Sequence, residues 1–268
     1  MTNINLLISD YSMVELITAD EQIFHLYHNT KKNSKNTFNF DAVIILFPGL
    51  PSFVDKDTLV NLLKSESKKK VGVFHVYYPG YWLNKGLFTP KNLDLFTVEI
   101  IKTITKGTGL STFDGSKLFW KFKNAYIYGI SFGSYFLFQN YSKIENLTNK
   151  EIRLFSPLLT INKDIITTYD RGYYTTFEKQ NRVFLKFLRQ GYSTVLNGID
   201  NPKWDEFFFN NTVTIPKKRY TKLHIIHGEH DKQISPSLIK NISSEFNASL
   251  TLKPIGHSKK ILNLDSIS

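Results

Sequence analysis

The chain has 268 residues, of which 41% are hydrophobic and 21% charged, the balance expected of a globular protein with a substantial core. It contains no cysteine, which excludes disulfides, thiolate metal ligands and a cysteine nucleophile. The net charge of +11 raises the question of nucleic acid. The lysines, however, come in short scattered groups and no nucleic-acid motif is present, so we expect solvated surface lysines and no nucleic-acid partner.

The start of the chain, MTNINLLISD, lacks a basic segment followed by an apolar one, so we expect no signal peptide. The apolar run AVIILF is far too short to cross a bilayer. Together these features predict a soluble, cytoplasmic protein without a membrane span.

The first part of the chain is rich in strand signals. Residues 4–9, 13–18 and 22–29 are short β-branched or aromatic runs separated by turn-forming residues, and each predicts a strand. Residues 29–41 are polar and predict a loop at a sheet edge. The continuous apolar run 42–47 then predicts a strand buried on both faces, as in a parallel sheet.

Strands and helices alternate from there on. Apolar residues at helical spacing predict a helix over 55–67. Further strands are predicted over 71–80, 125–131 and 150–157, and further helices over 93–107 and 134–144. This alternation is typical of a doubly wound, mostly parallel α/β sheet, with ligands at the carboxyl ends of its strands.

The alternation lapses after Pro157 for about sixty residues, which is too long for an ordinary loop. We therefore predict a single domain over residues 1–268 with a small helical cap or lid inserted at 158–220. The alternation resumes with a strand at 222–231, a helix at 235–246 and a strand at 248–257.

A Gly-x-Ser-x-Gly motif, Gly129 to Gly133, lies between a predicted strand and a predicted helix. A nucleophile at the tip of such a turn is held in an unfavourable backbone conformation, and its neighbours two residues away must be small. Ser131 is therefore the candidate nucleophile, at the positive end of the following helix.

A serine needs a base and a group that orients the base. Asp231 follows a strand that ends at Gly228, and His257 follows the last strand. Both are at carboxyl ends, on the same side of a parallel sheet as Ser131. Glu229 lies in the same turn as Asp231 and is a rival for the orienting role.

With these residues the sequence resembles the serine hydrolases of the α/β-hydrolase fold, from about Ala42 to His257. The resemblance implies Ser131 as the nucleophile of a nucleophile elbow, Asp231 as the acid of the catalytic triad and His257 as its base. It implies an α/β sheet of the α/β-hydrolase type with a small helical cap insertion.

The resemblance also implies an oxyanion hole made by two backbone amides, those of Phe132 and Leu50. Pro48 stands where the family usually has histidine in the loop after the first buried strand. A backbone donor does not depend on that side chain. Family members often line their pocket with residues after the second buried strand, which here are Tyr77, Tyr78 and Trp82.

The activity implied is hydrolysis of a carboxylic ester or thioester through an acyl-enzyme, with a small acyl compound as substrate and without metal or cofactor. The YPGYW loop and the helical insertion also somewhat resemble the prolyl-oligopeptidase-like branch, so a peptidase or amidase is an alternative. An acyltransferase would use the same triad. A different class of function, a binding protein that has kept the fold and lost catalysis, is a further alternative.

Three histidines, His224, His227 and His230, have a spacing that suggests zinc. Residues three apart in a strand point to opposite faces, so His224 and His227 are badly placed to share a metal. We expect no metal site.

Overall fold

The structure is a computed structural model that describes residues 12–18, 21–49, 59, 62–63, 69–80, 84–87, 89–159, 220–232, 234–257 and 262. The strand expected at 4–9 and almost all of the cap expected at 158–220 lie outside these residues. The helix expected at 55–67 is described only at Leu59, Leu62 and Leu63, which are helical and buried. Within the described part of the chain, no helix combines the length and apolar character needed to span a bilayer.

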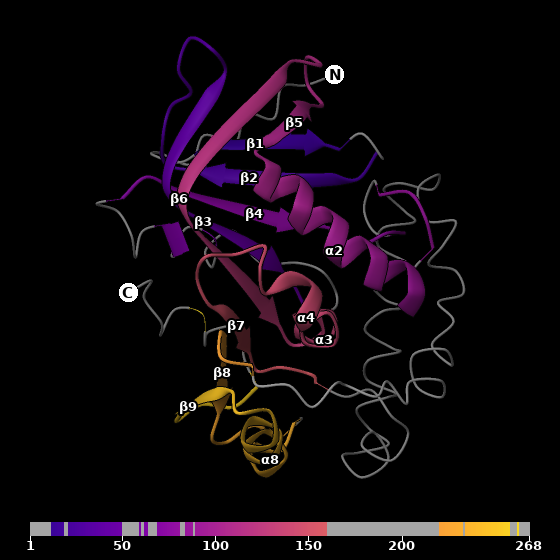
Figure 1. The fold of residues 1–268 in the computed structure, drawn as a ribbon, viewed down its shortest axis with the longest axis vertical. Helices are drawn as coiled ribbons and strands as arrows, with labels where there is room; N and C mark the ends of the chain where they lie inside the picture. The colour runs from indigo at the N-terminus through magenta and orange to yellow at the C-terminus, as the bar shows by residue number, and fades with distance from the viewer. Residues whose placement is uncertain are drawn as a thin grey trace.

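The described strands form one mixed sheet (Figure 1). Their bounds are β1 Ser12–Ile17, β2 Ile23–His28, β3 Thr37–Phe47, β4 Val71–Val76, β5 Thr108–Ser111, β6 Lys117–Ile130, β7 Ile152–Phe155, β8 Leu223–Gly228 and β9 Ser249–Lys253. Backbone pairing runs β1-β2-β4-β3-β6-β7-β8-β9. The pairs from β4 through β3 to β9 are parallel, and β1 and β2 are antiparallel to their neighbours, so the expected mostly parallel sheet is confirmed.

The β5–β6 hairpin adds a feature that the sequence analysis missed. β5 pairs antiparallel both with β1 and with the start of β6, so that β1, β2, β4, β3, β6 and β5 form a closed circuit of pairings. β6 begins at Lys117, eight residues before the strand expected from Ala125. The loop prediction for 29–41 is wrong at its end, because Thr37–Asp41 already belongs to β3 and pairs with the start of β6.

The ends of α2 and the start of α8 are at residues that cap helices well. α2, Pro90–Lys106, starts with Thr89, whose side chain accepts a hydrogen bond from the amide of Asn92, and ends at Gly107 with φ 81°. α8, Pro236–Phe246, starts with Ser235. The helix expected over 134–144 is divided into α3, Phe132–Gln139, and α4, Tyr141–Ile144, with Asn140 between them.

The sheet separates two apolar clusters. One contains side chains of α2, α3, α4 and α8, together with Phe74 and Tyr78 of the β4 region. The other packs Leu59, Leu62 and Leu63 with Ile44 and other side chains of the opposite sheet face. Helical residues on both faces explain why the parallel strands are continuous apolar runs.

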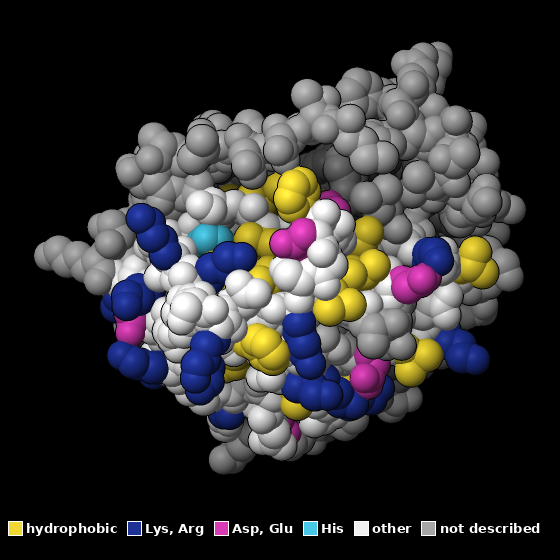
Figure 2. Space-filling model, turned by 90° about the horizontal axis from the view of Figure 1, so that it is seen from above, with side chains coloured by type: hydrophobic (Ala, Val, Ile, Leu, Met, Phe, Trp, Pro, Cys, Tyr) yellow, Lys and Arg dark blue, Asp and Glu magenta, His cyan; other side chains and the backbone are white. Residues whose placement is uncertain are grey.

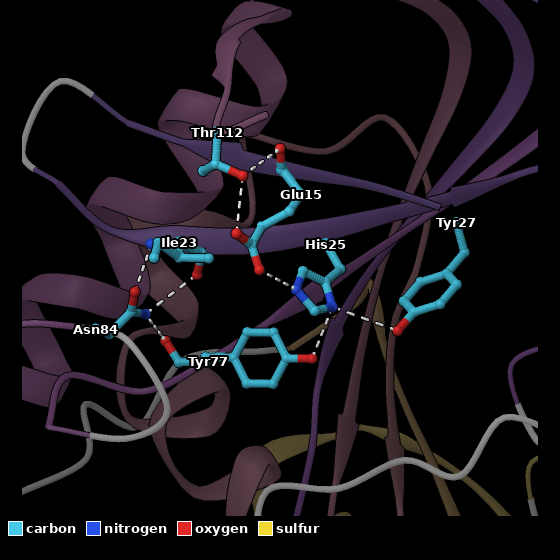
Figure 3. Close-up of polar contacts among 7 residues, drawn as sticks. All are labelled: Glu15, Ile23, His25, Tyr27, Tyr77, Asn84 and Thr112. Carbon is cyan, nitrogen blue, oxygen red and sulfur yellow. Dashed lines mark hydrogen bonds and ion pairs between the residues drawn. The ribbon is translucent and has the colours of Figure 1, made fainter. Parts of the chain in front are cut away.

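A polar network supports the segment after β4 (Figure 3). Asn84 exchanges hydrogen bonds with the backbone of Ile23 in β2 and also donates to the carbonyl of Tyr77. The Tyr77 hydroxyl lies 2.9 Å from Nδ1 of His25, whose Nε2 lies 2.9 Å from the Glu15 carboxylate. These contacts hold the chain that leaves β4 against β1 and β2.

Candidate active site

Ser131 lies between the end of β6 and the start of α3 with φ 47° and ψ −113°. A positive φ is unfavourable for a residue with a Cβ atom, so the turn must be held by its surroundings. Both its backbone amide and its backbone carbonyl make hydrogen bonds. Its amide donates to Phe155 at 2.9 Å, and its carbonyl accepts from Ser134 and Leu158 at 3.0 Å each.

The two glycines of the motif lie where a side chain would collide with backbone. A Cβ atom on Gly133 would lie 2.3 Å from the carbonyl oxygen of Phe47, in β3. On Gly129 it would lie 2.8 Å from Cα of Ser134, in the following helix. The spacing of the motif therefore follows from two close approaches, of helix to β3 and of helix to β6.

Asp231 and His257 are in direct contact. Nδ1 of His257 lies 2.8 Å from Oδ2 of Asp231, whose carboxylate is fully buried, whereas the His257 side chain is 18% exposed. The other oxygen, Oδ1, accepts from the amide of Ile234 at 2.9 Å. Glu229, the rival considered for the orienting role, is exposed.

The turn that carries Asp231 is tied to the segment that carries His257. The amides of Glu229 and His230 donate to Lys253 and Ile255, at 2.7 and 3.0 Å. A Cβ atom on Gly228 would lie 2.3 Å from the carbonyl oxygen of Ile255. The close contact between the two segments therefore requires glycine at 228.

His227 is a neighbour of this pair that sequence reasoning did not identify. It is fully buried, its Nε2 donates to the carbonyl of Ile234 at 2.9 Å, and the same atom lies 3.6 Å from Oδ2 of Asp231. Burial lowers the pKa of His227 and the charge of His257 lowers it further, against the opposing effects of Ile234 and Asp231. A neutral His227 leaves the Asp231 carboxylate to His257.

Strand register brings the elbow and this pair to one edge of the sheet. Ile130 is in register with Phe155, and Phe155 with Ile226, so Ser131 and His227 follow at the same level. β8 and β9 are likewise parallel, and His257 follows β9. The predicted Ser131, Asp231 and His257 therefore all lie beyond the carboxyl ends of parallel strands of one sheet, β6, β8 and β9.

The loop after β3 lies against the elbow. A Cβ atom on Gly49 would lie 3.3 Å from Cβ of Ser131. The hydroxyl of Tyr78 donates to the carbonyl of Pro48 at 2.6 Å, and the Tyr78 ring packs edge-on against Phe132 with centroids 6.0 Å apart. Leu50, expected to supply an oxyanion amide, lies outside the described residues.

The two described residues that were expected to line the pocket, Tyr77 and Tyr78, lie in different surroundings. Tyr78 is fully buried beneath the loop after β3, whereas Tyr77 is buried beside His25. Trp82 lies outside the described residues. A cavity of about 340 Å³ lies between α2, the β1–β2 turn and the segment after β4, but Ser131, Asp231 and His257 are not among the residues that line it.

The histidines of the zinc hypothesis do not form a common cluster. Nε2 of His224 lies 2.8 Å from the Thr251 hydroxyl, and His227 is paired with Ile234. Within the described residues, no group of three or more histidine, aspartate and glutamate side chains has a metal-binding arrangement.

The fold is that of the α/β hydrolases, a mostly parallel sheet wound on both faces by helices, with the strand-to-helix elbow at a central strand. Similar solved structures include an esterase of Pyrococcus furiosus, with 15% identity, a TM-score of 0.56 and coverage of 97% of this chain and 87% of the other. Est1E of Butyrivibrio proteoclasticus, solved with ferulic acid, has 14% identity, a TM-score of 0.57 and 93% coverage of each chain.

A third similar structure is an α/β-hydrolase enzyme from a deep-sea metagenome, with 15% identity, a TM-score of 0.55 and 91% coverage of each chain. No protein-family model matches the sequence, and no curated protein does so. Similarity at this level of identity establishes the fold.

Proposed function

We propose that this protein is a serine hydrolase that cleaves a carboxylic ester or thioester through Ser131, His257 and Asp231. The observation that carries the proposal is the 2.8 Å contact between His257 and the buried Asp231, at the same sheet edge as the strained turn of Ser131. A nucleophile, a base and a group that orients the base are the components that acyl transfer requires.

Asp231 sets the tautomer of His257. Its carboxylate accepts a hydrogen bond from Nδ1–H, which leaves Nε2 unprotonated and able to act as the base. Nε2 takes the proton of the Ser131 hydroxyl as Oγ attacks the carbonyl carbon, and returns that proton to the departing alkoxide or thiolate. A water molecule, deprotonated by His257, then releases the acid and regenerates Ser131.

The developing oxyanion is stabilised by the amide of Phe132 and, as we propose, by that of Leu50. Phe132 is the first residue of α3, so its amide lies at the positive end of that helix dipole. Tyr78 is a positioning residue, because it holds the carbonyl of Pro48 two residues before Leu50. The region 158–220 would form the cap over this edge.

An ester is favoured as the substrate by the similar structures, which include a named esterase, a named putative lipase of Acinetobacter baumannii and one complex with ferulic acid. A peptidase, an amidase and an acyltransferase would use the same three residues. No contact in the described part of the chain favours one of them over an esterase.

The nucleophile is tested by covalent labelling with a fluorophosphonate probe and by hydrolysis of p-nitrophenyl esters of increasing chain length. We expect labelling of the wild type, none of Ser131→Ala, and hydrolysis lowered by about three to six orders of magnitude in that variant. Ser134→Ala, which changes a buried serine three residues away, should keep both activities.

Equal labelling of Ser131→Ala and wild type would reject Ser131 as the nucleophile. A folded wild type without labelling or hydrolysis would instead support a binding protein on this fold. Aminoacyl p-nitroanilides run beside the esters distinguish the remaining classes, and faster turnover of the anilides would assign the protein to the peptidases or amidases.

A further inference from the structure

The β5–β6 hairpin exposes apolar side chains that the proposed chemistry does not use. Phe113, in the turn of the hairpin, is 80% exposed, Leu110 of β5 is 41% exposed and Phe119 of β6 is 39% exposed. The turn lies at the end of β6 remote from Ser131, since β6 runs from Lys117 to Ile130. We call Leu110, Phe113, Lys117, Phe119 and Lys121 the hairpin face.

Strand alternation places the side chains of Leu110, Lys117, Phe119 and Lys121 together, next to the turn that carries Phe113. Leu110 is in register with Lys117, and the exposed Lys117, Phe119 and Lys121 follow one another at every second position of β6. The residues between them, Leu118 and Trp120, point the other way and are buried in the core. The hairpin therefore carries apolar side chains on both faces, but only the face of Leu118 and Trp120 is buried.

Lysines surround the exposed face. Lys117 lies 5.3 Å from the centre of the Phe119 ring, and Lys121 follows it on the strand. The β2–β3 loop adds the exposed Lys31, Lys32 and Lys35, and its Asn36 accepts a hydrogen bond from the amide of Phe119 at 3.0 Å. The end-on view in Figure 2 shows many Lys and Arg side chains, with hydrophobic ones between them.

Few acids oppose this charge. Asp114 lies in the turn, where hydrogen bonds from Ser116 mainly, and the charge of Lys32 to a lesser degree, lower its pKa. Asp41 is paired with Lys123 at 2.7 Å. Across the hairpin face and the β2–β3 loop, the lysines therefore outnumber the nearby carboxylates.

We propose that the hairpin face docks on the surface of an anionic phospholipid bilayer, with Phe113 inserted among the headgroups and the lysines on the phosphates. A bilayer interface favours an aromatic ring at the tip together with basic residues around it. A second copy of this chain is disfavoured as the occupant, because the two basic faces would repel each other.

Docking through this face leaves the other end of β6, and with it Ser131, directed away from the bilayer. The attachment therefore holds the protein at a membrane without closing or opening the proposed active site. Membrane binding and ester hydrolysis are then separate properties. Loss of one in an experiment does not bear on the other.

The test is co-sedimentation of the full chain with vesicles of equal parts phosphatidylserine and phosphatidylcholine, compared with vesicles of phosphatidylcholine alone. We expect binding to the anionic vesicles only, weakened by salt. Each lysine near the surface contributes about fivefold to partitioning, so Lys117→Glu with Lys121→Glu should weaken binding by at least about twentyfold. Phe113→Ser should weaken it at unchanged charge.

The matched control is Lys91→Glu with Lys240→Glu, two exposed lysines on α2 and α8 that carry the same change of charge outside the hairpin face. The control should lose much less affinity. Equal losses in the two double variants, or no binding of the wild type at low salt, would overturn the proposal. Circular dichroism of every variant reports whether it is folded.

Duplex DNA is the competing anion, and it is tested in the same buffers. Binding to DNA that depends on Lys117 and Lys121 but not on Phe113, together with weak binding to vesicles, would assign the face to nucleic acid and reject the membrane proposal. Stronger binding to vesicles with a requirement for Phe113 supports it.

Discussion

Gly133 illustrates how a single residue constrains the site. It lies two residues after Ser131, in the first turn of α3, and its missing side chain allows the helix to approach the backbone of Phe47 and Pro48. That approach brings the loop after β3 next to Ser131. The same glycine therefore affects both the elbow and the proposed oxyanion loop.

We predict that Gly133→Ala destabilises the protein by about 3 kcal/mol or more, since the new Cβ would lie within 2.3 Å of a backbone oxygen that belongs to β3. The measurement is urea unfolding followed by circular dichroism. Gly115→Ala is the control, because Gly115 has φ 67° but no heavy atom within 4 Å of the added Cβ, and should cost only about 1 kcal/mol. Similar costs for the two variants would contradict the close approach.

At this scale the sequence predicted Ser131, Asp231 and His257 from local signals: a glycine spacing, and the position of each residue after a strand. Their roles remain proposals. It did not predict that His227 would lie beside Asp231 or that the hydroxyl of Tyr78 would donate to Pro48. The first depends on the conformation of the turn after β8, and the second on a contact between residues 30 apart in the chain. A buried contact of that kind leaves no periodic pattern.

At the scale of elements, the loop after β3 is held by its neighbours. Tyr78 follows β4 and donates to Pro48, while Asn84 ties the same segment to β2 (Figure 3). The position of the proposed oxyanion loop therefore depends on how β4 and β2 are joined.

We predict that Tyr78→Phe lowers kcat for p-nitrophenyl ester hydrolysis by about tenfold with little change in KM, because the Pro48 carbonyl loses its donor and the loop shifts. Folding stability should fall by about 1–3 kcal/mol. Tyr135→Phe, at a buried tyrosine of α3, is the control and should keep kcat. A kcat unchanged in Tyr78→Phe would remove Tyr78 as a positioning residue.

The elements were predicted best where both sheet faces are buried. The run 42–47 and the strands that follow are continuous apolar stretches, and the structure has them as β3, β4, β6, β7 and β8. β5 and the first half of β6 were missed although apolar residues occupy every second position of KLFWKFK, at Leu118, Trp120 and Phe122, and although Asp114-Gly115 is a turn signal. The sequence of a strand with one face in solvent resembles that of a polar loop if only its charged residues are considered.

For the whole molecule, buried histidines link stability to pH. Burial, reinforced by the charge of His25, lowers the pKa of His75 from 6.5 to about 3, and burial lowers that of His28 to about 4. Between these values and 6.5 the unfolded chain binds protons that the folded chain does not. Stability from this source is therefore full above pH 6.5 and is lost as the pH falls.

We predict that lowering the pH from 7 to 5 costs the wild type about 2 kcal/mol of unfolding free energy through His75 alone. His75→Phe, which keeps an aromatic ring beside Tyr77, should lose about 2 kcal/mol less over the same interval. The measurement is urea unfolding at both pH values. His230→Gln, at an exposed histidine, should behave as the wild type, and an unchanged pH dependence in His75→Phe would contradict the prediction.

The circuit of pairings completed by β5 has a consequence for how the protein behaves in a concentrated solution. β1 has β2 along one side, and on the other side Leu16 and Ile17 pair with β5, so the backbone groups at this end of β1 are not left as a template for a strand of another molecule. A strand that pairs on one side only is a common starting point for aggregation. The short strand of four residues, Thr108–Ser111, thus covers the end of β1 that would otherwise be open to intermolecular β-sheet growth.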